Sequence, residues 1–253
     1  MLDLDRLLPE IVALADRAGA VILEHYHGDV AVRAKADASP VTAADEAAEA
    51  VILARLAEVT PGIPVVAEET VASGHVPDLD EGPFWLVDPL DGTKEFLSRN
   101  GEFTVNIALI EGREPVLGVV QAPARARAWW GARGKGATAR DAEGNTRPIA
   151  VRKAPAGLVA IASRSHRDPE TQAFLDRAGV AECISAGSSL KFCLVAEGKA
   201  DLYPRFGRTM EWDVAAGHAV LSAAGGQVTT KDGAPFLYRK PGFENPPFIA
   251  RGA

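Results

Sequence analysis

Apolar residues recur every three or four positions along the first 26 residues. The repeating positions are Leu4, Leu7, Leu8, Ile11, Leu14, Ala15, Ala18, Ile22 and Tyr26. This spacing places them on one face of a helix, which Pro9 would bend or restart. A second helix is predicted to begin after Thr42, because Thr42 suits an N-cap and Asp45 stands at the capping-box position three residues later.

Shorter apolar runs bounded by glycine and proline predict strands. The segments "FTVNIALI", "EPVLGVVQAP" and "RAWWGAR" predict an antiparallel meander, and "GKGATARDAEGNTRPIA" predicts a hairpin after it. Beyond about residue 152, strands alternate with helices, a pattern typical of α/β architecture. We therefore expect an α+β N-terminal half, residues 1–152, and an α/β C-terminal half, residues 153–253.

Charge and composition narrow the function. The chain has 253 residues, of which 47% are hydrophobic, and a net charge of −7. This balance argues against a broad basic face, so no nucleic-acid partner is expected. No apolar run approaches the ~18 residues of a spanning helix, and the N-terminus lacks the features of a signal peptide. A cytoplasmic protein is expected, while peripheral attachment to the inner membrane stays open. Cys183 and Cys193 are expected to be buried, reduced thiols.

The segment "WLVDPLDGTKEF", residues 85–96, carries the candidate chemistry. Asp88 and Asp91 follow an apolar strand, and Gly92 and Thr93 come next. One interpretation is a polar turn, because Asp-Pro and Asp-Gly are common turn dipeptides. The other is a metal site that faces a phosphate.

Further acids stand at the ends of other predicted elements and favour the metal site. They are Glu68, Glu69 and Asp213. Hard cations such as Mg²⁺ bind carboxylate oxygens, and several carboxylates together indicate one or more ions. Gly92 and Thr93, at a helix start, could present backbone amides to a phosphate. Strand alternation does not decide between Glu68 and Glu69, and Asp213 could also cap its helix.

Four ordered motifs resemble the inositol monophosphatase superfamily. They are "KADASPVTAADEAAE", "VVAEET", "WLVDPLDGTKEF" and "EWDVAAGHAVLSAAGG". The segments "SRSHRDPE" and "GSSLKFCLVAEGKADLYPRFG" resemble more narrowly the bacterial 3'(2'),5'-bisphosphate nucleotidases of the CysQ type. The resemblance implies a layered αβαβα sandwich of the sugar-phosphatase type. It also implies a Mg²⁺-dependent, lithium-sensitive phosphatase.

The resemblance assigns the metal ligands residue by residue. Glu68 would bind a metal ion, Asp88 would bridge two ions, and Asp91 and Asp213 would complete the site with the backbone carbonyl of Leu90. Two or three Mg²⁺ ions per site are implied. Glu68, Leu90, Asp91 and Asp213 would also border the bound substrate.

The same resemblance supplies the remaining roles. Gly92 and Thr93 would bind the scissile phosphate through their amides, and Thr93 with Asp45 would orient the attacking water. The nucleotide would be held by His166, Ser188, Lys191 and Arg205. The capping box would explain Asp45 fully without a catalytic role. A hydrogen bond within its loop would explain His166 without a role in nucleotide binding.

These features predict an enzyme that hydrolyses the 3'-phosphate of adenosine 3',5'-bisphosphate to AMP and phosphate, and 3'-phosphoadenylyl sulfate is a second candidate substrate. The expected context is sulfur assimilation. Activity on inositol monophosphate or a sugar bisphosphate is the first alternative. A non-catalytic regulatory module with the same fold is the second. The expected partner is a small phosphorylated nucleotide, and the choice between monomer and homodimer stays open.

Overall fold

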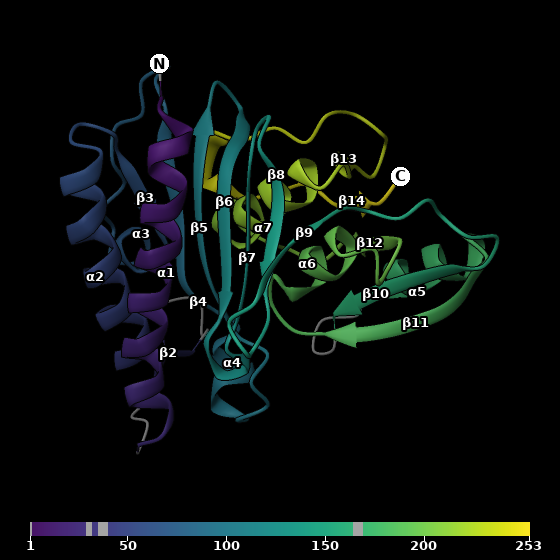
Figure 1. Ribbon diagram of the computed structural model, residues 1–253, viewed down its shortest axis with the longest axis horizontal. Helices are drawn as coiled ribbons and strands as arrows, with labels where there is room; N and C mark the ends of the chain where they lie inside the picture. Colours follow the sequence, from purple (N-terminus) through teal and green to yellow (C-terminus); the bar gives the residue numbers. More distant parts are fainter. Residues whose placement is uncertain (1, 29–31, 35–39, 164–168) are drawn as a thin grey trace.

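The computed structural model describes residues 2–28, 32–34, 40–163 and 169–253. Its elements form alternating helical and sheet layers (Figure 1). α1 and α2 cover one face of a large sheet, α6 and α7 lie between this sheet and a smaller one, and α5 lies beyond. The predicted αβαβα sandwich is confirmed.

The longer helices form where the sequence pattern predicts them, whereas α3 and the 3₁₀ turns were not predicted. They are α1 (Leu4–Tyr26), α2 (Ala43–Val59), α3 (Glu68–Ala72), α4 (Thr93–Leu97), α5 (Pro169–Arg177), α6 (Leu190–Ala196) and α7 (Glu211–Ala223), with 3₁₀ turns η1 (Pro123–Arg125) and η2 (Pro241–Phe243). Pro9 lies within α1 without ending it. The predicted capping box of α2 is confirmed, because the Thr42 side chain accepts from the Ala44 amide and Asp45 accepts from the Thr42 amide.

The large sheet has seven strands in chain order. They are β3 (Val65–Ala67), β4 (Phe84–Asp91), β5 (Thr104–Glu111), β6 (Glu114–Ala122), β7 (Arg127–Ala132), β8 (Gly136–Arg140) and β9 (Thr146–Ile149). β3 and β4 are parallel, and every later neighbouring pair is antiparallel. The predicted meander and hairpin are therefore confirmed.

The small sheet has five strands in the order β11-β10-β12-β14-β13. They are β10 (Leu158–Ser163), β11 (Val180–Ala186), β12 (Leu202–Arg205), β13 (Gln227–Thr230) and β14 (Phe248–Arg251). β10 pairs in parallel with both β11 and β12, whereas β14 is antiparallel to its two neighbours. A short ladder of β1 (Val32–Ala34) and β2 (Pro40–Thr42) stands apart.

Both faces of the large sheet are buried, and alternate residues enter different cores. On β4, Phe84 and Leu86 pack in the core shared with α6 and α7, while Trp85 and Val87 pack in the core under α1 and α2. This alternation follows from the two-residue repeat of a strand. It also explains why "FWLV" is apolar throughout, since helices cover both faces.

The sequence expectation for one of the two cysteines is wrong. Cys193 is buried as predicted, but Cys183 is exposed. Cys183 lies on β11, which is an edge strand of the small sheet, so part of its surface stays open to solvent. Among the described residues, no helix combines the length and the apolar character that crossing a membrane requires.

Candidate active site

The end of β4 brings the first two acids into the interior. Asp88 is buried on the same side of the strand as Leu86, opposite Asn106 of β5. The register of the two strands shifts between Asp88 and Asp91, which marks a bulge. Within it, Asp88 Oδ1 accepts the Leu90 amide at 3.0 Å. The strand therefore ends in a turn that is held by its own carboxylate.

Asp91 is oriented by donors from the neighbouring strand. Its Oδ2 atom accepts Asn106 Nδ2 at 3.2 Å and Thr104 Oγ1 at 3.4 Å. Both donors are fully buried on β5. One oxygen of Asp91 is thus committed to the sheet, which fixes the direction of the other.

Gly92 joins β4 to α4 in a conformation that favours glycine. Its φ is +95°, in the left-handed region. α4 begins at Thr93, whose Oγ1 donates to Asp45 Oδ1 at 3.4 Å. Asp45 Oδ2 meanwhile accepts the Thr42 amide and hydroxyl at 2.8 and 2.6 Å. The structure therefore brings together Asp45 and Thr93, and Asp45 also caps its helix.

Glu68 is the first residue of α3, a short helix that the sequence did not predict, and the strand before it ends at Ala67. A buried acid on α2, Glu49, holds this helix start by accepting the Glu69 and Thr70 amides, each at 2.8 Å. Sequence reasoning missed Glu49. The available signal was its spacing of four residues from Asp45, which places both acids on the buried face of α2.

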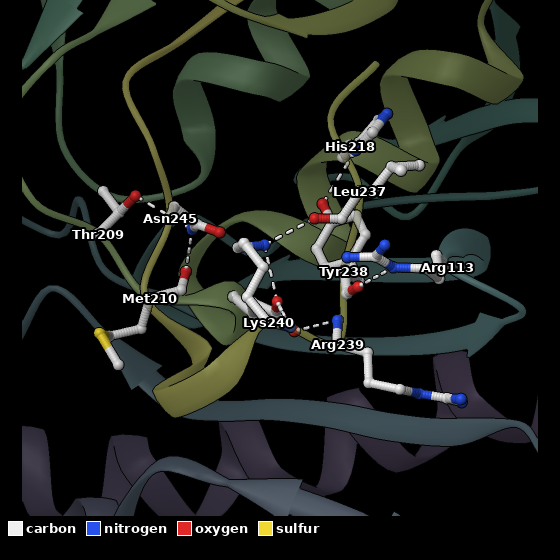
Figure 2. Close-up of polar contacts among 10 residues, drawn as sticks. Arg113, Thr209, Met210, His218, Leu237, Tyr238, Arg239, Lys240 and Asn245 are labelled. Atoms are coloured by element: carbon white, nitrogen blue, oxygen red, sulfur yellow. Dashed lines mark hydrogen bonds and ion pairs between the residues drawn. The ribbon is translucent and has the colours of Figure 1, made fainter. Parts of the chain in front are cut away.

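Asp213 lies in the first turn of α7. Figure 2 shows polar contacts that join Thr209 and Met210, just before this turn, to Asn245. Asp213 Oδ2 accepts the Met210 amide at 2.8 Å, and Asn245 Nδ2 donates to the Met210 carbonyl at 2.6 Å. The buried Glu211 accepts the backbone amides of Arg239 and Lys240 at 3.0 and 2.8 Å. The segment 239–245 thus fixes the helix end that carries Asp213.

The three aspartates form one electrostatic unit. Burial, and then the negative charges of Glu68, Asp91 and Asp213, raise the pKa of Asp88 well above its ordinary value. Burial followed by the charges of Asp91 and Glu68 raises the pKa of Asp213. Burial likewise raises the pKa of Asp91, although Lys191 and Asn106 oppose the shift. These aspartates come from two distant parts of the chain, the end of β4 and the start of α7, and the fold gathers them within electrostatic reach.

A divalent cation suits this donor set, because it would neutralise several buried carboxylates at once. Glu68 belongs to the same unit, since its charge acts on all three aspartates. In the described part of the chain, no group of three or more His, Cys, Asp or Glu side chains already stands in a metal-holding geometry. The suitability of this site for a metal ion therefore rests on the chemistry of its carboxylates. The turn places Leu90 between Asp88 and Asp91.

Two of the predicted nucleotide-binding residues lie beside the aspartates. Ser188 has a φ of +50°, and its Oγ donates to the Asp91 carbonyl at 2.7 Å. α6 begins only at Leu190, so Ser188 precedes the helix instead of starting it. The buried Lys191 Nζ donates to the Ser188 carbonyl at 2.5 Å. Burial lowers the pKa of Lys191 to about 8, and the charge of Arg205 adds to that shift against the opposing charge of Asp91.

Arg205 ends β12, and its guanidinium donates to the Arg208 carbonyl at 3.1 Å. His166 lies outside the described residues. Another missed residue, Glu102, holds the segment before α6, because it accepts the Gly187 amide at 2.8 Å and pairs with Arg125 at 2.9 Å. A cavity of about 390 Å³ lies along the second half of α7, and none of the predicted site residues lines it.

The chain belongs to the inositol monophosphatase family, whose model matches residues 3–249. It is 49% identical over 245 residues to the 3'(2'),5'-bisphosphate nucleotidase CysQ of Escherichia coli K12, with 96% of this chain and 98% of that protein covered. A CysQ of Buchnera aphidicola is 43% identical, with 92% and 88% covered. The crystal structure of CysQ from Bacteroides thetaiotaomicron has a TM-score of 0.80 at 39% identity, with 94% of each chain covered. An inositol monophosphatase from Anabaena has the same TM-score at 30% identity, with 100% of this chain and 92% of that one covered.

Proposed function

We propose that this protein is a Mg²⁺-dependent 3'(2'),5'-bisphosphate nucleotidase. It hydrolyses the 3'-phosphate of adenosine 3',5'-bisphosphate to AMP and inorganic phosphate. 3'-phosphoadenylyl sulfate is a second candidate substrate. The proposal is supported by a sequence identity of 49–50% to curated CysQ nucleotidases over 96% of the chain. The observation that carries it is the set of buried, mutually repelling aspartates beside Gly92 and Thr93.

In this proposal, Glu68, Asp88, Asp91, Asp213 and the Leu90 carbonyl hold the magnesium. Asp88, Asp91 and Asp213 each have one oxygen engaged by a local donor, and we assign the other oxygen of each to metal. When bound, Mg²⁺ supplies positive charge to the phosphate and lowers the pKa of a coordinated water. Two or three ions are proposed. The acids keep these charges in a water-poor interior, where electrostatic interactions are stronger.

The chain's own groups then handle the proton and the phosphate. Asp45 Oδ1, which accepts Thr93 Oγ1, is the atom proposed to receive a proton through that hydroxyl. Asp45 Oδ2 is held by Thr42, so the carboxylate cannot easily turn away. The amides of Gly92 and Thr93 are proposed to bind the scissile phosphate.

The second phosphate and the nucleoside are assigned to the C-terminal half, residues 153–253. Lys191 brings a cation to the edge of the aspartate cluster, and Ser188, Arg205 and His166 are proposed to complete this subsite. Metal binding, in contrast, falls mainly to residues 1–152. An inositol monophosphate has no second phosphate for Lys191 to bind, and this difference separates the main proposal from activity on inositol phosphates.

Phosphate release from a substrate panel tests the proposal. Adenosine 3',5'-bisphosphate, 3'-phosphoadenylyl sulfate, inositol 1-phosphate and fructose 1,6-bisphosphate would be compared by kcat/KM, with Mg²⁺ and after chelation. The nucleotides are expected to exceed the other esters by at least tenfold, about 1.4 kcal/mol in transition-state binding, and chelation is expected to abolish turnover. A higher kcat/KM for inositol 1-phosphate would favour the alternative, and hydrolysis that survives chelation would reject the metal role.

A further inference from the structure

We propose that Asn106 and Ser189 are positioning residues that join Asp91 to the start of α7 and so set the spacing between Asp91 and Asp213. This inference rests on the proposed function, because it takes these two aspartates as metal ligands. The family resemblance assigns a role to neither residue. Three hydrogen bonds follow one another across the site from Asp91 to Asp213.

The bonds form a continuous chain between the two halves of the protein. Asn106 Nδ2 donates to Asp91 Oδ2 at 3.2 Å and to Ser189 Oγ at 3.0 Å. Ser189 Oγ in turn donates to the Asp213 backbone carbonyl at 2.9 Å. An amide nitrogen only donates, so the Ser189 hydroxyl accepts from Asn106 and directs its own proton to Asp213. The donor and the acceptor of each of these three hydrogen bonds are therefore determined.

The orientation of the Asn106 amide is also determined. Asn106 is fully buried, and within the described part of the chain its Oδ1 atom has no hydrogen-bond partner. A flipped amide would place that oxygen against the Asp91 carboxylate, which is electrostatically unfavourable. A buried carbonyl oxygen without a partner lowers stability. This loss of stability occurs at a position where the amide nitrogen of Asn106 binds two acceptors, Asp91 and Ser189.

The position of Asn106 explains what the chain of bonds does. Asn106 lies on β5 directly opposite Asp88, on the face that packs toward α7. Two ionised carboxylates repel each other, so Asp91 and Asp213 benefit from a restraint that fixes their separation. The Asn106–Ser189 link supplies one. Groups that orient metal ligands in this way commonly change metal affinity 10- to 100-fold when they are removed.

Direct Mg²⁺ titration of the metal-depleted full-length protein by calorimetry tests the link. Asn106→Leu removes the amide at similar volume, and Ser189→Ala removes the hydroxyl. Each is expected to raise the Mg²⁺ Kd about 10-fold. Because both changes break the same link, the double variant is expected to remain near 10-fold instead of reaching about 100-fold. Thr60→Val is the control, since it removes a buried hydroxyl that bonds Trp85 and the Leu56 carbonyl and leaves every contact of the aspartates intact.

Thermal unfolding of the metal-free proteins separates positioning from packing. An unchanged Kd with a lowered Tm would overturn the inference, as would fully additive effects or an equal effect of Thr60→Val on the Mg²⁺ Kd. If Asn106→Leu does not fold, the comparison of Ser189→Ala with Thr60→Val decides. If the wild-type protein binds no Mg²⁺, the proposed function itself is rejected. If the wild type and the variants bind Mg²⁺ equally well, only the inference about Asn106 and Ser189 is rejected.

Discussion

At the scale of single residues, Lys191 is expected to link ionisation to substrate binding. Its pKa is lowered to about 8, chiefly by burial, so the ammonium loses its proton at lower pH than an exposed lysine does. We expect KM for adenosine 3',5'-bisphosphate to rise as pH increases through this value, with kcat changing less. Lys191→Ala should raise KM at neutral pH by about 10- to 150-fold, equivalent to about 1.5–3 kcal/mol. The KM of this variant should not rise further at alkaline pH. If the alkaline rise in KM persists in the variant, another ionisable group causes it.

Gly92 is the second test at this scale. A Cβ atom here would stand 2.2 Å from Ser188 Oγ and 3.2 Å from Glu95 Oε2, in a backbone with φ of +95°. Gly92→Ala is expected to lower the free energy of unfolding by about 1–3 kcal/mol and to reduce kcat sharply. Gly112→Ala is the control, because Gly112 also has positive φ (+64°) but no atom within 4 Å of an added Cβ. Equal kcat losses in the two variants would show that contact with Ser188 is irrelevant.

The sequence predicted some of these residues and missed others for a physical reason. Asp88 and Asp91 can be recognised in the sequence because two acidic residues follow an apolar strand. Asp45 and Thr93 form a hydrogen bond, as the family resemblance implies. Asn106 looks like an ordinary polar residue within "FTVNIALI", because its partners lie 15 and 83 positions away. Contacts of that kind depend on how the sheets and helices are assembled, and no local pattern contains them.

At the scale of elements, α7 is positioned by glycines of the sheet beneath it. A Cβ at Gly118 of β6 would stand 2.5 Å from the Ala216 carbonyl oxygen, and a Cβ at Gly131 of β7 would stand 2.6 Å from Ala223 Cβ. Glycine in a strand permits such a close backbone approach. α7 therefore lies nearer to the sheet than larger residues would allow, and Asp213 lies at its first turn.

Gly118→Ala should consequently push α7 outward. We expect a loss of about 1–3 kcal/mol in the free energy of unfolding, together with a weaker Mg²⁺ affinity because Asp213 moves with the helix. Urea unfolding and metal titration would measure the two effects. Gly252→Ala is the matched control, since the nearest atom to its added Cβ is 3.4 Å away. A destabilised Gly118→Ala protein with unchanged Mg²⁺ affinity would refute the positioning role of the helix contact.

Periodicity predicted most elements well, and its failures are informative. Helix α1 shows the full three- and four-residue spacing and was predicted across its whole length. β14 was not predicted. Only four residues long, it pairs antiparallel between β12 and β13, so the small sheet is mixed rather than purely parallel. A strand this short has too few residues to display alternation and is defined by its neighbours.

At the scale of the whole molecule, the buried aspartates oppose folding when metal is absent. Raised carboxyl pKa values mean that the folded protein binds more protons than the unfolded chain between the ordinary and the raised pKa. The free energy of unfolding of the metal-free protein should therefore fall as pH rises through this range. Mg²⁺ should reverse the loss, since it binds the ionised form.

Asp213→Asn makes this prediction specific. Asparagine can still accept the Met210 amide, but it carries no charge. We expect the metal-free variant to melt higher than metal-free wild type at mildly alkaline pH, by about 2–4 °C for each kcal/mol of relieved repulsion. The difference should vanish in acid, where both proteins are neutral at this position, and Mg²⁺ should stabilise the variant less. A variant that melts lower than wild type at every pH would contradict the repulsion.

The most direct measurement is the Mg²⁺ dependence of phosphate release from adenosine 3',5'-bisphosphate by wild type and Asp88→Asn. Asparagine keeps an acceptor for the Leu90 amide, so the turn at the end of β4 is expected to persist. Wild-type activity should saturate with Mg²⁺, and the variant should lose about 10³-fold or more in kcat while its unfolding remains cooperative. Near-wild-type turnover by a folded Asp88→Asn protein at limiting Mg²⁺ would contradict metal-assisted hydrolysis at this site.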